Sequence, residues 1–114
     1  MQLLLTSTAA MSLVCSGTEL GLSKGRTETV PFEISYRVDV DGSRWSVEPC
    51  DEVKKIRSRE SALLILYEGS NPRLNMHART TLDLISGAFE DRLLMGRYGF
   101  IRRGRCEEAA GKKL

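Results

Sequence analysis

The sequence predicts a small, mostly β protein built as an antiparallel meander that either closes into a barrel or folds into a sandwich. Three observations support this fold class. Apolar and polar residues alternate along two segments, turn-forming residues separate short β-prone segments, and no segment shows long helical periodicity. The chain has 114 residues, which is close to the usual size of one domain, so a single core is expected.

The single β-rich domain is predicted to span residues 13–107. Residues 1–12 are apolar and rich in small side chains, and they are interpreted either as the remnant of an export signal or as a first strand. A complete signal would need an early basic residue, and none occurs before Lys24. Residues 108–114 are expected to form a flexible tail.

The clearest strand is predicted at residues 32–40, where five apolar residues alternate with polar ones. A turn signal follows at Asp41 and Gly42, and residues 44–47 are predicted as the second strand of a hairpin. Residues 17–29 are rich in glycine and threonine, and they are interpreted as the end of a strand followed by a loop.

The segment after this hairpin has two interpretations. One is a short helix over residues 51–59, because acidic residues stand near its start and basic residues near its end. The other is a strand that carries Val53 and Ile56. Residues 62–67 form a continuous apolar run, which is typical of a buried strand, and they are expected to lie at the centre of the sheet.

Three more strands are predicted in the second half of the chain. Residues 74–84 alternate in polarity, and their threonine and asparagine residues favour a strand over a helix. Turn signals at Ser86–Gly87 and at Gly96 then separate strands over residues 89–95 and 98–106.

The three cysteines, Cys15, Cys50 and Cys106, bear on the cellular compartment. Their spacing matches no zinc motif, and no metal or other cofactor is expected. In an oxidising compartment the expected disulfide joins Cys15 to Cys106, the first and last ordered segments, and leaves Cys50 as a free thiol. The alternative is a cytosolic protein with three reduced, buried cysteines.

No catalytic signature is present, so a non-enzymatic role is expected. His77 is the only histidine, and no nucleophile motif accompanies it. The turn at Asp41–Gly42 partly resembles a calcium-binding loop, but Arg37 stands where the first carboxylate ligand is needed. The sequence also lacks a glycine-rich phosphate-binding loop.

Basic residues gather among aromatic ones in residues 97–105. This candidate partner surface consists of Arg97, Arg102, Arg103 and Arg105. Arginine and aromatic side chains together are typical of surfaces that bind single-stranded nucleic acids. The net charge of only +2 argues against a nucleic acid, so a protein partner or a second copy of the chain is also considered. No apolar run is long enough to predict a membrane-spanning helix.

Four short motifs together carry a resemblance: Leu13–Thr18, Arg37–Trp45, Ser86–Phe89 and Gly104–Glu107. Their combination resembles small exported alphaproteobacterial proteins of unknown function. The resemblance supports an outer disulfide between Cys15 and Cys106, and it implies no activity. Relatives of this kind carry a cysteine directly after the tryptophan, where this chain has Ser46, so an unpaired Cys50 is implied.

The leading interpretation is an exported or periplasmic, non-enzymatic binding or interaction module. Its basis is the export-like ends of the sequence and the missing catalytic signatures. The alternative is a cytosolic β-rich module that binds nucleic acid or protein through residues 97–105.

Overall fold

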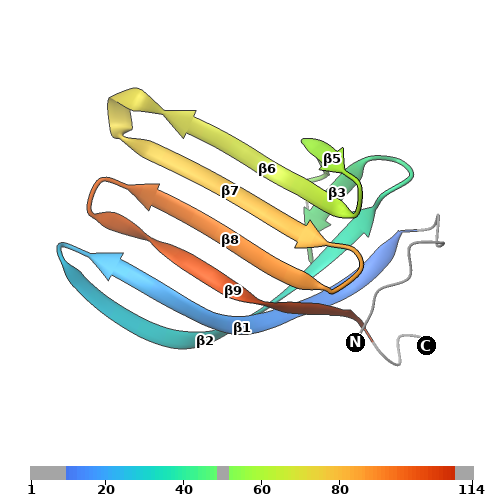
Figure 1. Ribbon diagram of the computed structural model, residues 1–114, viewed down its shortest axis with the longest axis horizontal. Coiled ribbons are helices and arrows are strands. Elements are labelled where there is room, and N and C mark those ends of the chain that lie inside the picture. The colour runs from blue at the N-terminus through green and yellow to red at the C-terminus, as the bar shows by residue number, and fades with distance from the viewer. Residues whose placement is uncertain (1–9, 49–51, 110–114) are drawn as a thin grey trace.

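Nine strands form a single sheet in the computed structural model, which describes residues 10–48 and 52–109 (Figure 1). A short 3-10 turn, η1 (Pro72–Leu74), is the one helical element in the described part of the chain. The predicted mostly β fold class is confirmed. The strands are β1 (Met11–Ser23), β2 (Arg26–Asp39), β3 (Arg44–Val47), β4 (Lys54–Lys55), β5 (Ser58–Glu60), β6 (Leu63–Asn71), β7 (Met76–Asp83), β8 (Ala88–Met95) and β9 (Tyr98–Glu108).

The sheet is made of two meanders that meet in its middle. Its strand order is β4-β3-β2-β1-β9-β8-β7-β6-β5, and all neighbouring strands are antiparallel. Strands β1 and β9 pair from Leu13–Glu108 to Ser23–Tyr98. The first and last strands of the chain therefore form the central junction of the sheet.

The sheet curls into a half-barrel, and the sandwich alternative is wrong. Its two edge strands, β4 and β5, are consecutive in the chain, with only Ile56 and Arg57 between them. The backbone N–H of Ile56 donates to Ser43 O at 2.9 Å, and that of Arg57 donates to Ile65 O at 2.9 Å. This segment thus bridges the two edges at one end of the half-barrel, which we call the closed end.

The helix alternative for residues 51–59 is wrong over residues 52–59, which the structure describes. Lys54 and Lys55 pair with β3, while Ser58–Glu60 pair with β6. Because two separate strand edges accept these backbone groups, an extended chain satisfies hydrogen bonds that a short exposed helix would leave to water. Of the two residues in the strand interpretation, Ile56 is buried and Val53 is exposed.

The core fills the closed end. The apolar residues predicted to face inward from residues 32–40 do so, with Tyr36 buried and Val38 fully buried. The ring of Tyr36 lies 5.9 Å from that of Trp45 and 5.4 Å from that of Phe89. The indole Nε1–H of Trp45 on β3 donates to Leu66 O on β6 at 3.0 Å, which connects opposite sides of the half-barrel.

Most of the apolar run at residues 62–67 forms a buried strand as predicted, since Leu64, Ile65 and Leu66 are buried, whereas Tyr67 is exposed. The predicted position at the centre of the sheet is wrong. The strand is β6, which lies next to the edge strand β5. Leu64 and Leu66 are buried because the curl of the sheet brings this edge against β3. A high density of apolar residues therefore reflects burial, which a curled sheet provides even near its edge.

The loop predicted within residues 17–29 is also wrong, because these residues form the long hairpin of β1 and β2. Only Lys24 and Gly25 form the turn, both with positive φ, 49° and 82°. Strand β1 is paired on both sides, with β2 and with β9. The two ladders outweigh the low intrinsic strand preference of its glycines.

Two glycines allow the central strands to approach each other closely. Gly17 on β1 and Gly104 on β9 are directly opposed, and a Cβ atom at Gly17 would lie 2.6 Å from the Cα of Gly104. Phe32 on β2 and Phe89 on β8 flank this pair in the same row across the sheet. Their ring centroids are 6.2 Å apart, although two strands lie between them. The missing side chains thus let the two rings meet.

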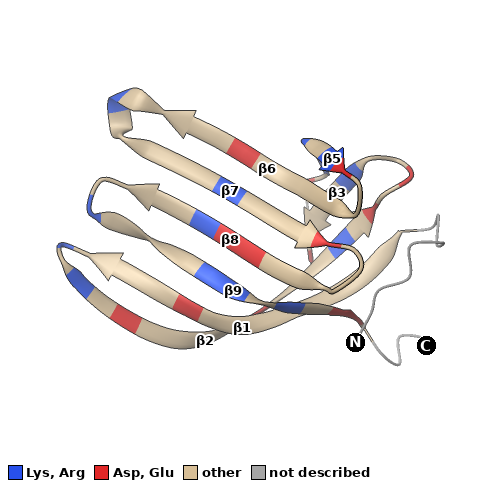
Figure 2. Cartoon of the chain, in the orientation of Figure 1, with Lys and Arg blue, Asp and Glu red and all other residues tan. Residues whose placement is uncertain are grey.

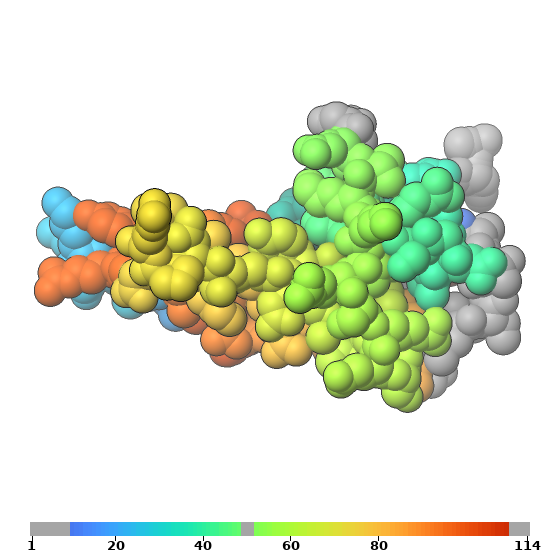
Figure 3. All heavy atoms as spheres, turned by 90° about the horizontal axis from the view of Figure 1, so that it is seen from above, coloured from blue at the N-terminus to red at the C-terminus, as the bar shows by residue number. Residues whose placement is uncertain are grey.

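At the other end, which we call the open end, three hairpins project as a single layer (Figures 1 and 3). Their tips are residues 24–25, 72–75 and 96–97. Strand β3 pairs with β2 only over Tyr36–Asp39, and β5 pairs with β6 only over Leu63–Ile65. The half-barrel is therefore unbridged here, and the molecule measures 43 × 27 × 27 Å.

The first and last residues of the predicted domain, 13 and 107, lie on β1 and β9, the two strands of the central junction. Met11 is buried as the first residue of β1, and β9 ends at Glu108. The backbone N–H of Ala109 donates to Ser12 O at 2.8 Å. Residues 1–9 and 110–114, which carry most of the predicted export segment and tail, lie outside the described residues.

Candidate functional site

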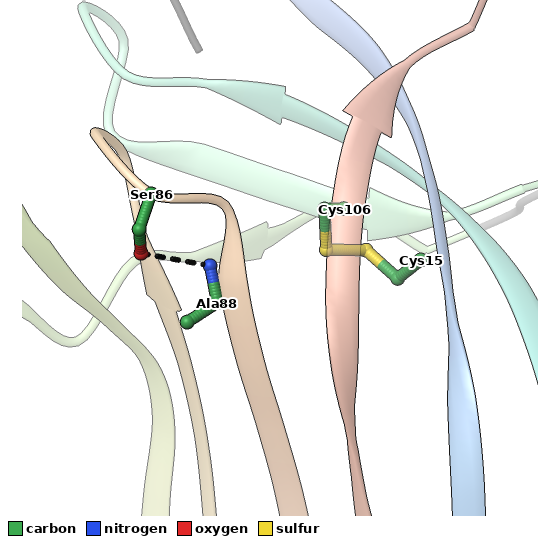
Figure 4. The surroundings of a disulfide bond; sticks show 4 residues. All are labelled: Cys15, Ser86, Ala88 and Cys106. Carbon is green, nitrogen blue, oxygen red and sulfur yellow. Dashed lines mark hydrogen bonds between the residues drawn. A yellow bond between two sulfur atoms is a disulfide. The ribbon is translucent and has the colours of Figure 1, made fainter. Parts of the chain in front are cut away.

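The predicted disulfide between Cys15 and Cys106 is present (Figure 4). The two cysteines are directly opposed in the β1–β9 ladder, and their exposed fractions are 1% and 2%. The bridge joins residues 91 positions apart in the sequence. It thus links the two strands of the central junction covalently. The predicted free thiol, Cys50, lies outside the described residues.

The turn between β7 and β8 is fastened beside this bridge (Figure 4). The backbone N–H of Cys106 donates to Gly87 O at 2.8 Å, and the N–H of Ala88 donates to Ser86 Oγ at 3.1 Å. Gly87 has φ = +81°, and a Cβ atom there would lie 2.7 Å from Cys106 O. This close contact and the positive φ both require glycine at this position.

The four arginines of the candidate partner surface do not form one surface. Successive residues of a strand point to opposite faces, and Cys106 points into the core. Arg102 is therefore on the concave face, while Arg103 and Arg105 are on the convex face. Arg97 lies in the exposed tip between β8 and β9.

The two convex arginines already have partners. Arg103 Nε donates to Glu90 Oε2 at 2.8 Å, and Arg105 Nη1 donates to the backbone carbonyl of Ser86 at 3.1 Å. Both contacts are at the protein surface, where an ion pair such as Arg103–Glu90 contributes little stability. They nevertheless break the continuous cationic face that nucleic-acid binding by residues 97–105 would need.

Arg102 forms the centre of a polar row that crosses four strands, which we call the polar belt (Glu19, Thr80, Asp91 and Arg102). Its Nε donates to Glu19 Oε1 at 2.7 Å, and its Nη1 donates to Asp91 Oδ2 at 3.1 Å. The hydroxyl of Thr80 donates to Asp91 Oδ1 at 2.8 Å. The belt therefore ties β1, β9, β8 and β7 together where the core ends and the open end begins.

Aromatic rings flank the guanidinium of Arg102. Its Cζ lies 4.1 Å from the ring centroid of Phe100 and 6.0 Å from that of Phe32, both within cation–π range. Burial disfavours the charge, but the hydrogen bond and charge of Glu19, together with Asp91, outweigh burial and raise the pKa of Arg102. The guanidinium therefore stays charged.

Tyr36 lies on the core side of the belt, and its hydroxyl is kept neutral. Burial first, and then the negative charge of Asp91, raise the pKa of Tyr36 well above its usual range, while Arg102 lowers it by less. A neutral phenol at this depth excludes Tyr36 as a general base at physiological pH.

Replacing Arg102 with methionine is expected to lower the free energy of unfolding by about 1–2 kcal/mol. Methionine keeps an apolar stem beside Phe100 but leaves the carboxylates of Glu19 and Asp91 without their cation. Urea unfolding of the wild type, R102M, E19Q and the double variant measures the coupling between Arg102 and Glu19. A coupling energy indistinguishable from zero would contradict the role of the belt.

Beyond the belt, apolar residues of β7, β8 and β9 share the concave face with two charged residues of β2, Glu28 and Arg26. Direct cross-strand pairing places Phe100, Leu93 and Ala78 in the next row, and Tyr98, Met95 and Met76 in the row after it, at the hairpin tips. Phe100, Leu93 and Met76 remain half-exposed. The open end thus presents partly exposed apolar side chains that the sheet itself does not cover.

His77 and the Asp41–Gly42 turn, the other two positions considered for chemistry, are not part of the polar belt. His77 is exposed on β7, and residues 10–48 and 52–109 hold no cluster of three potential metal ligands. At the Asp41–Gly42 turn, Asp39 Oδ1 accepts from the N–H of Gly42 at 2.9 Å, and Arg44 contacts the same carboxylate. These contacts lower the pKa of Asp39, so its carboxylate stabilises the turn.

The polar belt was not anticipated as a unit. Sequence reasoning selected Arg102 but missed Glu19, Thr80 and Asp91, which come from three other strands. One signal was available: steps of two residues from the core-facing Cys106 reach Arg102 and separate it from Arg103. Strand order, which the sequence alone does not contain, was needed to find its partners.

Comparisons with known proteins add no functional assignment. No protein-family model, curated protein or solved structure matches the chain. No helix in the described part of the chain is long and apolar enough to cross a membrane.

Proposed function

We propose that this protein is a non-enzymatic binding or interaction module that is exported or periplasmic. The observation that carries the proposal is the disulfide between Cys15 and Cys106 in the central junction of the sheet. Such bridges persist in oxidising compartments and are rare in the bacterial cytosol. The resemblance to small exported alphaproteobacterial proteins supports the same compartment.

The binding role is supported by the distribution of polar and apolar groups. The charged residues of the polar belt, Glu19, Asp91 and Arg102, are engaged with one another. Beyond them the open end exposes apolar side chains on projecting hairpins. Surfaces of this kind are typical of binding sites in proteins whose fold serves as a rigid scaffold.

The alternative, a cytosolic module that binds nucleic acid through residues 97–105, has less support. Arg102 and Arg103 lie on opposite faces of β9, and both have acidic partners. A single-stranded nucleic acid that lay along residues 97–105 would therefore contact only some of the positively charged side chains of this segment.

Fractionation of the native host, with a count of free thiols in the denatured protein, tests the proposal. We expect the protein in the extracytoplasmic fraction, with one free thiol before reduction and three after it. Three free thiols before reduction, in protein recovered from the cytosol, would refute the export proposal. Alkylation before lysis is needed, because air oxidation afterwards would form the same bridge.

A further inference from the structure

Each of the three hairpin tips at the open end carries a basic residue (Figure 2). Lys24 is in the tip between β1 and β2, Arg73 in that between β6 and β7, and Arg97 in that between β8 and β9. Arg26 directly follows the first tip, and all four side chains belong to exposed residues. We call these four residues the basic rim.

The basic rim lacks acidic partners. In the part of the chain that the structure describes, no ion pair includes any of its four residues. Glu28, two residues after Arg26 on β2, is the acidic residue nearest to the rim in the β1–β2 hairpin, and the two residues line one hollow without forming an ion pair. At the closed end Arg44 pairs with Asp39. Lys55, Arg57 and Arg59 at that end likewise take part in none of the ion pairs among the described residues. The rim is thus a local concentration of positive charge on a nearly neutral protein.

Exposed apolar side chains stand among these cations. Leu74, Tyr98 and Met95 have exposed fractions of 55%, 46% and 39%. Leu74 follows Arg73 in one tip, and Tyr98 follows Arg97 in another. Alternating cations and large apolar groups at projecting tips fit an anionic surface with an apolar layer beneath it.

The tips are held in one arrangement. The N–H of Gly96 donates to Asn75 O at 3.1 Å, which joins the tips of the β8–β9 and β6–β7 hairpins. Ser23 and Tyr98 pair across the β1–β9 ladder, which joins the third tip. Because these backbone groups are already hydrogen-bonded, the rim can enter an interfacial layer without exposing many unsatisfied donors.

A hollow of about 350 Å³ lies between the tips of the β1–β2 and β8–β9 hairpins. Its lining includes the basic residues Arg26 and Arg97 together with Leu22. Guanidinium groups bind phosphate through paired hydrogen bonds. Arg26 and Arg97 therefore give this surface hollow the charge to attract a phosphate-bearing headgroup.

From these features we propose that the open end docks on an anionic lipid membrane surface, with the basic rim at the phosphates and Leu74, Met95 and Tyr98 in the interfacial layer. A nucleic acid fits less well, because these cations are spread over three tips among aliphatic groups and Tyr98 is the single aromatic residue at the tips. This inference rests on the proposed binding role and specifies the partner. It does not depend on the compartment.

Sedimentation with lipid vesicles tests the proposal. The oxidised full chain is mixed with vesicles of phosphatidylcholine alone or with about one-third phosphatidylglycerol. We expect binding to the anionic vesicles only, weakening steeply with salt. Replacing Lys24, Arg73 and Arg97 with glutamine is expected to lower the partition coefficient about fivefold per cation removed. The Leu74→Ser variant is expected to lower it by about another fivefold.

A matched variant distinguishes location from total charge. Lys55, Arg57 and Arg59 are exposed at the closed end, and replacing these three with glutamine removes the same charge. This control should bind like the wild type, and circular dichroism should show that all variants remain folded. Equal loss of binding in the two triple variants would overturn the proposal. Equal binding of the wild type to neutral and to anionic vesicles would overturn it as well.

A spectroscopic measurement reports the contact directly. Tryptophan emission of a Tyr98→Trp variant should shift to the blue on anionic vesicles, whereas the buried Trp45 of the wild type should not change. Binding of an oligonucleotide that survives Leu74→Ser, without any vesicle binding, would identify a polyanion site and refute the membrane proposal. If vesicle binding fails while fractionation places the protein outside the cytosol, only this inference is refuted and the proposed function stands.

Discussion

Replacing Cys15 and Cys106 with alanine is expected to lower the free energy of unfolding by about 4 kcal/mol. The bridge spans 91 residues, and closing a loop of this length removes much of the conformational freedom of the unfolded chain. Both sulfurs are buried in the core, so their loss also removes packing contacts. Strands β1 and β9 would keep their ladder but lose the covalent link between them.

Urea unfolding of the two proteins, both in a Cys50→Ser background that prevents thiol exchange, measures this effect. Oxidised and reduced forms of the Cys50→Ser protein should differ in the same direction, with no change in side chains. Equal unfolding midpoints for the oxidised and reduced forms would show that the bridge does not stabilise the fold.

Adding a single methyl group at Gly17 or Gly104 is expected to destabilise the protein by about 3 kcal/mol. A Cβ atom at Gly104 would overlap Ser16 O and lie 2.8 Å from the Cα of Gly17. These neighbours are backbone atoms of a ladder paired on both sides, so they cannot move aside as a flexible side chain can. The contact between Phe32 and Phe89 would be disturbed as well.

Gly21→Ala is the matched control for these two variants. Gly21 lies on β1 and on the same face as Gly17, but the nearest atom to its Cβ position is Glu28 O at 3.7 Å, an ordinary contact distance. We expect its stability to change by less than about 0.5 kcal/mol. If G17A and G21A unfold at the same urea concentration, the close approach of β1 and β9 is not what requires glycine at Gly17.

Much of the strand content was predictable, because alternation is a local property. The inward positions of residues 32–40, the hairpin at Asp41–Gly42 and the strands around Gly96 all follow from residues close together in the sequence. The errors arose where pairing with distant strands decided the conformation. The glycines and threonines of residues 17–29 form strands because β1 is paired on both sides, and residues 52–59 are extended because two edges accept them.

In the candidate sites, too, the local features were predictable and the contacts with distant strands were not. The disulfide was predictable from the positions of Cys15 and Cys106 near the two ends of the domain. The different roles of Arg102 and Arg103 were not recognised, although strand periodicity separates them. Their partners come from elsewhere in the sequence: Glu19 for Arg102, and Glu90 for Arg103.

The sequence by itself determined the all-β class, most of the turns, the faces of the clearest strands and the cysteine pair. Only the tertiary structure decided that the first and last strands meet in the middle, that consecutive edge strands close one end, and that Lys24, Arg73 and Arg97 gather at the other. The physical reason is that alternation sets which way a side chain points, whereas strand order and curl depend on contacts between distant segments. The close approach at Gly17 and Gly104 is the clearest example, since each glycine is required by the backbone of the other's strand.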